Sequence, residues 1–551
     1  MSQNSDDDPT GPVARWARPA APAPDARIRT VGWLRARRSN TIGDLTAAAL
    51  LVLAVFLPWN LYFGIGIPGS SPALFAALLV VTLLSLASVA LAAAARRSSG
   101  AGLRRLRLAL NIPYVLLVLA FVGFDVFETV RWGGTVNVPG GVGPGAWLGI
   151  AGALLAARTP VAESAADGRT SGSARVIGYA SMAAAVLSFC FNLYWRVRYA
   201  LQSAGGSMDF GKQNVAVIAT AVVYGVVALV TVLAASRWLL QTTRAARLAT
   251  VALGASSLTA GIIVWTLPVG RDIDAFHGIA QNTSTAGVGF EGYLAWAAAA
   301  AICAPPTLFA LFARRETAAS EENAWRSAAR SGLGLIALWC LGSAAMRTTD
   351  LLVSVSLGYP FSRYDSVVLA AFDVITAVLA MWLRGNLGNE TRSARLISSL
   401  CGLLATLSIA RVVVGVALAP RFASSPTRPA QHPVYGNNLA QQITSTFDVT
   451  LCGLGLGVLA AAIVTGHLSG LHRRRRRRAA RARAAARTRI PVRRTPPSGA
   501  ATTRIPAGAH RESPTTELPR VAGAPRIFRG DDSATRQIPT RKPQIYRPPR
   551  P

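Results

Sequence analysis

The segment His472-Arg473-Arg474-Arg475-Arg476-Arg477-Arg478 divides this chain of 551 residues into two parts of opposite character. Six consecutive guanidinium groups are too costly to place inside a bilayer, so we predict that this segment lies in the cytoplasm. The residues before it, back to about Ile42, form apolar stretches of membrane-spanning length that are separated by short polar breaks. The residues after it form a basic tail.

The composition excludes a soluble globular protein of this length. Hydrophobic residues make up 51% of the chain and charged residues only 15%. Residues 471–551 hold 22 Lys and Arg against four acids, so +18 of the formal net charge of +32 lies in the tail. Lys212 and Lys542 are the only lysines, and this bias toward arginine, alanine and glycine is typical of a GC-rich actinobacterial genome. The sequence therefore indicates a polytopic membrane protein with a strongly basic tail.

Hydropathy predicts twelve spans. They cover residues 43–65, 71–95, 107–129, 144–158, 175–196, 214–236, 246–268, 291–313, 331–354, 366–384, 394–419 and 446–468. The fourth is only about sixteen residues long and follows a Gly/Pro-rich stretch, so it is expected to be short, tilted or re-entrant.

Arginine is enriched in alternate loops, which predicts the orientation of the chain. Arg107 and Arg158 are among the arginines expected at the cytoplasmic ends of the spans. Arg35, Arg37 and Arg38 precede the first span, and no cleavable signal is apparent before them. The positive-inside rule therefore places the protein in the plasma (inner) membrane with both termini in the cytoplasm.

The expected fold class is an all-α, polytopic integral membrane protein. We predict about 12 transmembrane helices arranged as six hairpins, with disordered cytoplasmic termini. The expected domains are a disordered N-terminal segment (1–41), a transmembrane helical domain (42–470) and a basic disordered tail (471–551). Five of the six outward helices begin with an arginine phrase, which is typical either of duplicated hairpins or simply of a positive-inside array.

Ionisable and amide side chains inside the predicted spans are the candidate functional residues. Each costs about 2.5–3.5 kcal/mol on insertion scales, so each needs a physical reason. Counting about 1.5 Å per residue from the cytoplasmic arginines places several of them about 24–27 Å along their helices, which defines a polar layer toward the outer leaflet. The layer contains Asp125, Glu128, Asn192, Arg347, Asp350, Asp373 and Arg411.

Two interpretations of this layer remain open. It forms an outward-facing cavity that binds a polar ligand or relays protons, or its members pair between helices and reach the nearby interface. Asp373 favours the functional interpretation, because it lies near mid-depth with no aqueous exit along its own helix. The phrase Phe-Asp-Val recurs at 124–126, 372–374 and 447–449, but the predicted depths differ, so we interpret the recurrence as coincidence.

No cofactor motif is present, and the metal signal is weak. Asp272, Asp274 and His277, in an outer loop, have the residue types of a divalent-metal site in membrane glycosyl or phosphoryl transferases. A lone Asp-x-Asp beside Arg271 is a weak signal, and the loop is too short for a catalytic domain. All five cysteines lie in apolar segments without CxxC spacing, so they predict neither disulfides nor a zinc site.

The tail is predicted to bind anionic lipid head groups through Arg473 to Arg478, rather than nucleic acid, because it lacks interleaved aromatic residues. The phrase Thr-x-x-(Ile/Leu)-Pro begins at Thr502, Thr515 and Thr535. These phrases resemble acceptor sites of actinobacterial membrane Ser/Thr kinases and phosphothreonine ligands of forkhead-associated domains. That resemblance implies a kinase and a forkhead-associated-domain protein as partners. Each phosphate would add about −1.5 to −2 charge among the arginines, which would weaken the attachment to lipid and create a docking point.

Two functional classes fit these observations. One is a carrier for a polar solute or a cell-envelope precursor, with Asp373 as the coupling carboxylate. The other is a non-transporting membrane scaffold for envelope or cell-division machinery. An enzyme, such as a lipid-linked glycosyl or phosphoryl transferase, is less favoured because no catalytic motif is found. The span count equals that of the major facilitator superfamily, but the loop 96–105 lacks its Asp-Arg-x-Gly phrase, so we assign no family.

Overall fold

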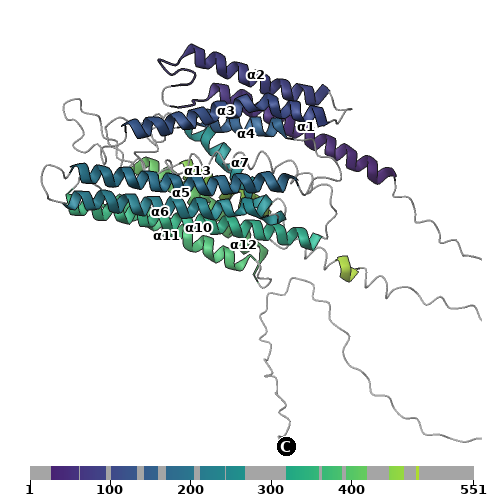
Figure 1. The fold of residues 1–551 in the computed structure, drawn as a ribbon. Helices are drawn as coiled ribbons and strands as arrows, with labels where there is room; N and C mark the ends of the chain where they lie inside the picture. The colour runs from purple at the N-terminus through teal and green to yellow at the C-terminus, as the bar shows by residue number, and fades with distance from the viewer. Residues whose placement is uncertain are drawn as a thin grey trace, which may run out of the picture. The chain divides into compact units, whose positions relative to one another are not determined.

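The computed structural model describes eleven α-helices that pack side by side (Figure 1). The described residues are 26–60, 63–94, 101–132, 142–158, 169–203, 211–241, 243–266, 318–358, 363–387, 392–418, 446–463 and 479–482. The helices are α1 (Ala26–Phe56), α2 (Pro72–Ala94), α3 (Ala101–Trp132), α4 (Pro144–Ala157), α5 (Arg169–Ser203), α6 (Lys212–Leu240), α7 (Arg244–Thr266), α10 (Ala318–Leu357), α11 (Arg363–Asn386), α12 (Ala394–Leu418) and α13 (Thr446–Ile463). Within these residues there is no strand, so the all-α prediction is confirmed for this part of the chain.

Eight of the described helices are long and apolar enough to cross a membrane. They are α2, α3, α5, α6, α7, α10, α11 and α12. Shorter apolar helices run from Asn40 to Phe56, from Pro144 to Ala157 and from Phe447 to Ile463. The predicted span 291–313 lies outside the described residues, and so the count of twelve spans and the six hairpins stay predictions.

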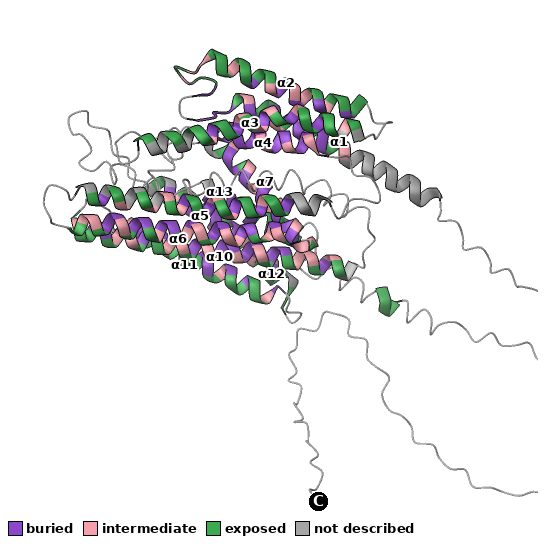
Figure 2. Ribbon diagram, viewed as in Figure 1, coloured by how far each residue is buried: buried purple, intermediate pink, exposed green. Residues whose placement is uncertain are grey.

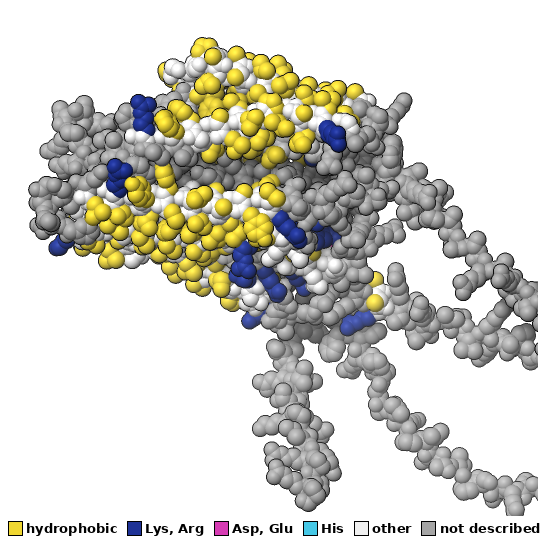
Figure 3. Space-filling model, in the orientation of Figure 1, with side chains coloured by type: hydrophobic (Ala, Val, Ile, Leu, Met, Phe, Trp, Pro, Cys, Tyr) yellow, Lys and Arg dark blue, Asp and Glu magenta, His cyan; other side chains and the backbone are white. Residues whose placement is uncertain are grey.

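Apolar side chains cover the outside of the described helices. Leu83, Leu187, Leu352 and Val378 each expose more than 60% of their surface. Figure 3 shows apolar side chains gathered over the described helices in two broad areas on one face, with basic side chains toward the helix ends. Patches of this extent are unusual on soluble monomers and match a hydrocarbon environment. The helices therefore indicate a membrane protein.

Helix α1 differs from the prediction at both ends. It begins at Ala26, inside the segment 1–41 that we expected to be disordered, and it ends at Phe56, nine residues before the predicted end at position 65. The chain contains no proline between Pro24 and Pro58, so nothing interrupts the helix over that interval. Past Pro58 the chain turns, and Trp59 Nε1 donates a hydrogen bond to the carbonyl oxygen of Ala54 at 2.9 Å.

The short helix α4 is buried among its neighbours. Its 14 residues span about 21 Å, less than the hydrocarbon thickness of about 30 Å. Eleven of them are buried (Figure 2), and the helix packs against α1, α2 and α3. Gly145, Gly149 and Gly152 face Trp59, Tyr114 and Leu51 so closely that a Cβ at any of the three would overlap its neighbour. Small residues at this spacing let helices approach closely inside a membrane.

Gly149→Ala is expected to destabilise the helix group α1 to α4 by about 1–3 kcal/mol, because the added Cβ meets the Tyr114 hydroxyl group. Gly123→Ala on α3 is the matched control, because a Cβ there has no atom within 4 Å. The control should be neutral or stabilising by up to about 1 kcal/mol. Thermal unfolding of the purified protein in detergent measures both, and equal midpoints would show that α4 is not tightly packed.

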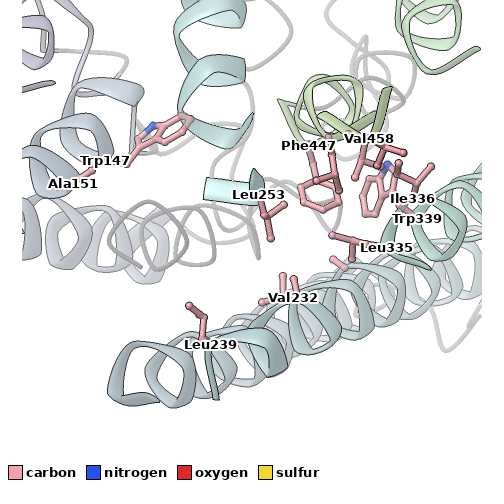
Figure 4. Close-up of a cluster of buried hydrophobic side chains, with 14 of the residues drawn as sticks. Trp147, Ala151, Val232, Leu239, Leu253, Leu335, Ile336, Trp339, Phe447 and Val458 are labelled. Carbon is pink, nitrogen blue, oxygen red and sulfur yellow. The ribbon is translucent and has the colours of Figure 1, made fainter. Parts of the chain in front are cut away.

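The other described helices form a second set of contacts. Helix α10, 40 residues long, packs against α6, α7, α11 and α13, and α12 lies between α11 and α13. Trp339 of α10 meets Phe447 of α13 edge to face, with ring centroids 4.9 Å apart (Figure 4). Leu335 and Ile336, one turn earlier on α10, are buried in the same apolar cluster. These contacts bring α10, α11, α12 and α13 around one interior.

Candidate functional site

Arg411 on α12 is the centre of a buried group of charged side chains. Its guanidinium contacts the carboxylates of Asp373 on α11 and Asp448 on α13, and its side chain is 3% exposed. Arg411 also donates to Ser343 Oγ of α10 at 3.4 Å. A single guanidinium thus joins four helices, which its five N–H donors permit.

Asp373 lies between two guanidinium groups. Arg347 on α10 donates from Nε to Asp373 Oδ2 at 2.8 Å, while Arg411 contacts Asp373 Oδ1. The Asp373 side chain is fully buried, and that of Arg347 is 3% exposed. The carboxylate therefore receives charge-assisted contacts on both oxygens, which is the arrangement that stabilises a buried anion best.

Asp448 is stabilised as an anion by its position on α13 and by two neighbouring side chains. It lies in the first turn of α13, where the helix dipole favours negative charge. Trp339 Nε1 donates to its Oδ1 at 2.5 Å, and Arg411 contacts the same oxygen. The indole of Trp339 is held in place by Phe447, the residue before Asp448.

Asp350 joins α6 to this group. The hydroxyl group of Tyr224 on α6 lies in hydrogen-bond contact with Asp350 Oδ2, and both residues are buried. Asp350 follows Arg347 by three residues on α10, so both side chains lie on one face of the helix. We call Arg347, Asp350, Asp373, Arg411 and Asp448 the charge network.

Two buried thiols lie close to the charge network. Cys340 follows Trp339 on α10, and Cys452 lies one turn after Asp448 on α13. The Cys452 thiol donates to the carbonyl oxygen of Ser408 at 3.0 Å. Cys401 on α12 is also buried, two to three turns before Arg411. These native thiols can report on water access to the interior.

A second buried charge cluster lies in the helix group α1 to α4. Asp44 Oδ1 on α1 accepts hydrogen bonds from Arg107 Nη2 and Arg158 Nη2, each at 3.3 Å. Arg107 Nε donates to the carbonyl oxygen of Ala156 at 2.9 Å, and Arg158 donates to the carbonyl oxygen of Asn40 at 2.7 Å. The cluster joins the middle of α1 to the N-terminal part of α3 and the C-terminal end of α4.

The structure brings together four members of the predicted polar layer, namely Arg347, Asp350, Asp373 and Arg411. Asp125 and Glu128 fall within α3 and Asn192 within α5, but the side chains of these three lie outside the described residues. The candidate metal residues Asp272, Asp274 and His277 lie outside them too, as do Arg473 to Arg478 and Thr502, Thr515 and Thr535. Within the described residues no group of three or more His, Cys, Asp or Glu side chains could hold a metal ion.

Three features were missed or misread from the sequence. Asp448 is not part of the predicted polar layer, although it lies in one of the three Phe-Asp-Val phrases. Two copies of the phrase meet at one place although their predicted depths differ, because Asp373 and Asp448 contact the same guanidinium, while the interpretation of the recurrence as coincidence stays a prediction. Arg107 and Arg158, expected at cytoplasmic ends, have side chains only 2% and 8% exposed, because Asp44 neutralises part of their charge.

Comparison with protein-family models gives a match over most of the chain. A family model described as a domain of unknown function, DUF7937, matches residues 40–467. No curated protein and no solved structure matches the chain. The family match covers more than three quarters of the sequence and contains both buried charge clusters. The chain therefore belongs to the DUF7937 family.

Proposed function

We propose that this protein is a plasma-membrane carrier for a polar solute or a cell-envelope precursor, and that the charge network is its moving polar core. The proposal is carried by the pairing of Asp373, a fully buried carboxylate, with two guanidinium groups from two other helices. In this role the ion pairs hold α10, α11, α12 and α13 closed, and a polar solute that competes for the guanidinium groups opens them.

Energetics favour a functional reason for these charges. Removing ions from water costs several kcal/mol each, and well-packed apolar residues of similar volume often give an interior that is equally stable or more stable. Ionisable residues within membrane helices therefore mark functional sites by default. Four such residues in contact across four helices, with the buried Asp350 three residues from Arg347, are more than helix packing alone requires.

The competing function is the non-transporting scaffold. In a scaffold the same network only fixes the positions of the helices, so its interior stays closed to water at all times. A carrier must expose its polar core to one aqueous side in part of its cycle, and the minor state of such an equilibrium is typically populated at about 0.1–10%. Water access to the network therefore separates the two functions.

Labelling of the native thiols tests this. We expect a membrane-impermeant maleimide, applied to whole cells or to inside-out vesicles, to modify Cys340 or Cys452 faster than Cys401 from at least one side. The reason is that opening the network hydrates the first two thiols, which lie beside Trp339 and one turn after Asp448, whereas Cys401 lies two to three turns before Arg411 on α12. Mass spectrometry of the cysteine peptides gives the extent of modification at each time.

Two controls complete the experiment. Denatured protein shows that all three thiols react when exposed, and Cys452→Ser assigns the signal between the two thiols of the network. If Cys340 and Cys452 react no faster than Cys401 from both sides, the carrier function is wrong and the scaffold is favoured.

The topology and the tail complete the proposal. Twelve spans in six hairpins place both termini in the cytoplasm, and the arginine run at 473–478 binds anionic lipid head groups. Phosphorylation of the tail threonines by a Ser/Thr kinase weakens this attachment and recruits a forkhead-associated-domain protein. The arginine asymmetry and the Thr-x-x-(Ile/Leu)-Pro phrases of the sequence support these points.

A further inference from the structure

We propose that Asp350 is a proton-binding site, and that its protonation controls whether Arg347 stays paired with Asp373. The use of this site in coupling transport to a proton gradient rests on the proposed carrier function. The presence of the proton does not, because it follows from the contacts of the charge network. In this scheme Asp350, and not Asp373, is the carboxyl group that couples transport to the proton.

The charge network contains more acids than bases. Its five members are three carboxyl groups and two guanidinium groups, all on side chains that are nearly or fully buried. An uncompensated ion in such surroundings is strongly unfavourable, and a buried group usually changes its protonation state instead. One bound proton makes the network neutral.

The contacts identify which carboxyl group holds that proton. Asp373 accepts from two guanidinium groups, and Asp448 accepts from Arg411 and from the Trp339 indole N–H at a helix N-terminus. Both environments stabilise the ionised form. Asp350 has neither advantage, because it lies in the C-terminal part of α10, seven residues before Leu357, and its hydrogen-bond contact is the uncharged hydroxyl group of Tyr224.

The surroundings of Asp350 fit a neutral acid. Its Oδ2 meets the uncharged hydroxyl group of Tyr224 on α6, and within the described residues its Oδ1 has no hydrogen-bond partner. The charged or titratable groups that act on Asp350 within the described residues are Tyr224 of α6 and Arg347, which lies on α10 with Asp350. A protonated Asp350 can donate to the phenol oxygen or accept from it, so the pair is satisfied without a full charge.

Competition for Arg347 turns this site into a switch. When Asp350 is neutral, the Arg347 guanidinium remains on Asp373 and ties α10 to α11. When the proton leaves to water, the new carboxylate lies three residues from Arg347 on the same helical face and attracts it away from Asp373. No bond between heavy atoms changes, and the transferred species is one proton.

Infrared difference spectroscopy of the full-length protein in lipid bilayers tests the site directly. At neutral pH we expect a carboxylic acid C=O band that shifts in D2O and is lost in Asp350→Asn. Tyr224→Phe should shift this band without removing it, because only the hydrogen bond changes. Asp365→Asn, outside the charge network in the first turn of α11, should leave it unaltered.

Stability gives a second measurement. Asparagine resembles a protonated aspartic acid, so Asp350→Asn should leave the midpoint of thermal unfolding close to that of the native protein. A band that persists in Asp350→Asn, or a large fall in the unfolding midpoint, overturns the proton site. If the band behaves as expected but Cys340 and Cys452 never react, the proton site stands and the carrier function fails.

Discussion

Replacing Arg411 with methionine is expected to reduce the free energy of unfolding by about 3–5 kcal/mol. Methionine keeps most of the side-chain volume and removes the charge, so Asp448 loses its guanidinium partner and Asp373 keeps only Arg347. The variant then holds buried negative charge with no nearby compensation. Equilibrium unfolding in mixed micelles, with gel filtration to monitor the folded fraction, measures the loss.

Two further variants show whether charge is the cause. Arg395 lies on the same helix and has an exposed side chain, so Arg395→Met should change the free energy of unfolding by no more than about 0.5 kcal/mol. Arg411→Met combined with Asp448→Asn removes one charge of each sign and keeps an acceptor for the Trp339 indole. The double variant should regain more than half of the loss. A double variant as unstable as Arg411→Met would mean that the contact matters through its shape and not through its charge.

The double variant also separates folding from transport. In a scaffold, restored stability should restore the function of the protein in cells. In a carrier, the ion pair that must open and close is gone. The double variant should then fold, but the rate at which maleimide modifies Cys340 and Cys452 should no longer depend on opening of the network.

Much of the helical fold could be predicted from hydropathy, and its exceptions have local causes. Long apolar runs such as 72–94 are helices because their backbone groups must be satisfied within the segment. Hydropathy does not predict the end of α1 at Phe56, because the residues up to 65 are still mostly apolar. The helix nevertheless ends before Pro58, because proline does not continue a helix. The sequence signalled α4 as unusual, but its burial follows from glycines whose neighbours lie far away in the chain.

The charge network was only partly predictable. Arg347, Asp373 and Arg411 are conspicuous because their sequence neighbours are apolar, whereas Asp448 is close to the predicted end of a span and resembles an interface residue. Tyr224 and Trp339 carry no sequence signal of their contacts, since pairing with an acid on another helix leaves no local pattern.

Side-chain direction explains why depth counting separated residues that are in contact. Counted from cytoplasmic arginines, Asp373 was placed below Arg347 and Arg411. Side chains on a helix tilt toward its N-terminus, and helices joined by short connections run in opposite directions. The two arginines therefore reach back along α10 and α12 toward the level of Asp373 on α11, and a long arginine side chain spans the remaining distance.

Asp44→Leu is the second substitution with a large expected effect, a loss of about 3–5 kcal/mol in the free energy of unfolding. The change leaves the guanidinium groups of Arg107 and Arg158 close together and without their shared carboxylate. Each keeps a backbone carbonyl acceptor, at Ala156 and Asn40, so hydrogen bonding is partly retained while the charge is not. Thermal unfolding in detergent, together with proteolysis of α1, measures the effect.

Arg158→Met provides the opposite test on the same cluster. The native trio of Asp44, Arg107 and Arg158 carries one excess positive charge, so this variant leaves a neutral pair, whereas Asp44→Leu leaves two cations. We therefore expect Arg158→Met to cost less than half as much as Asp44→Leu. Equal losses from the two variants would show that hydrogen bonds to the backbone, and not the charge balance, hold α1, α3 and α4 together.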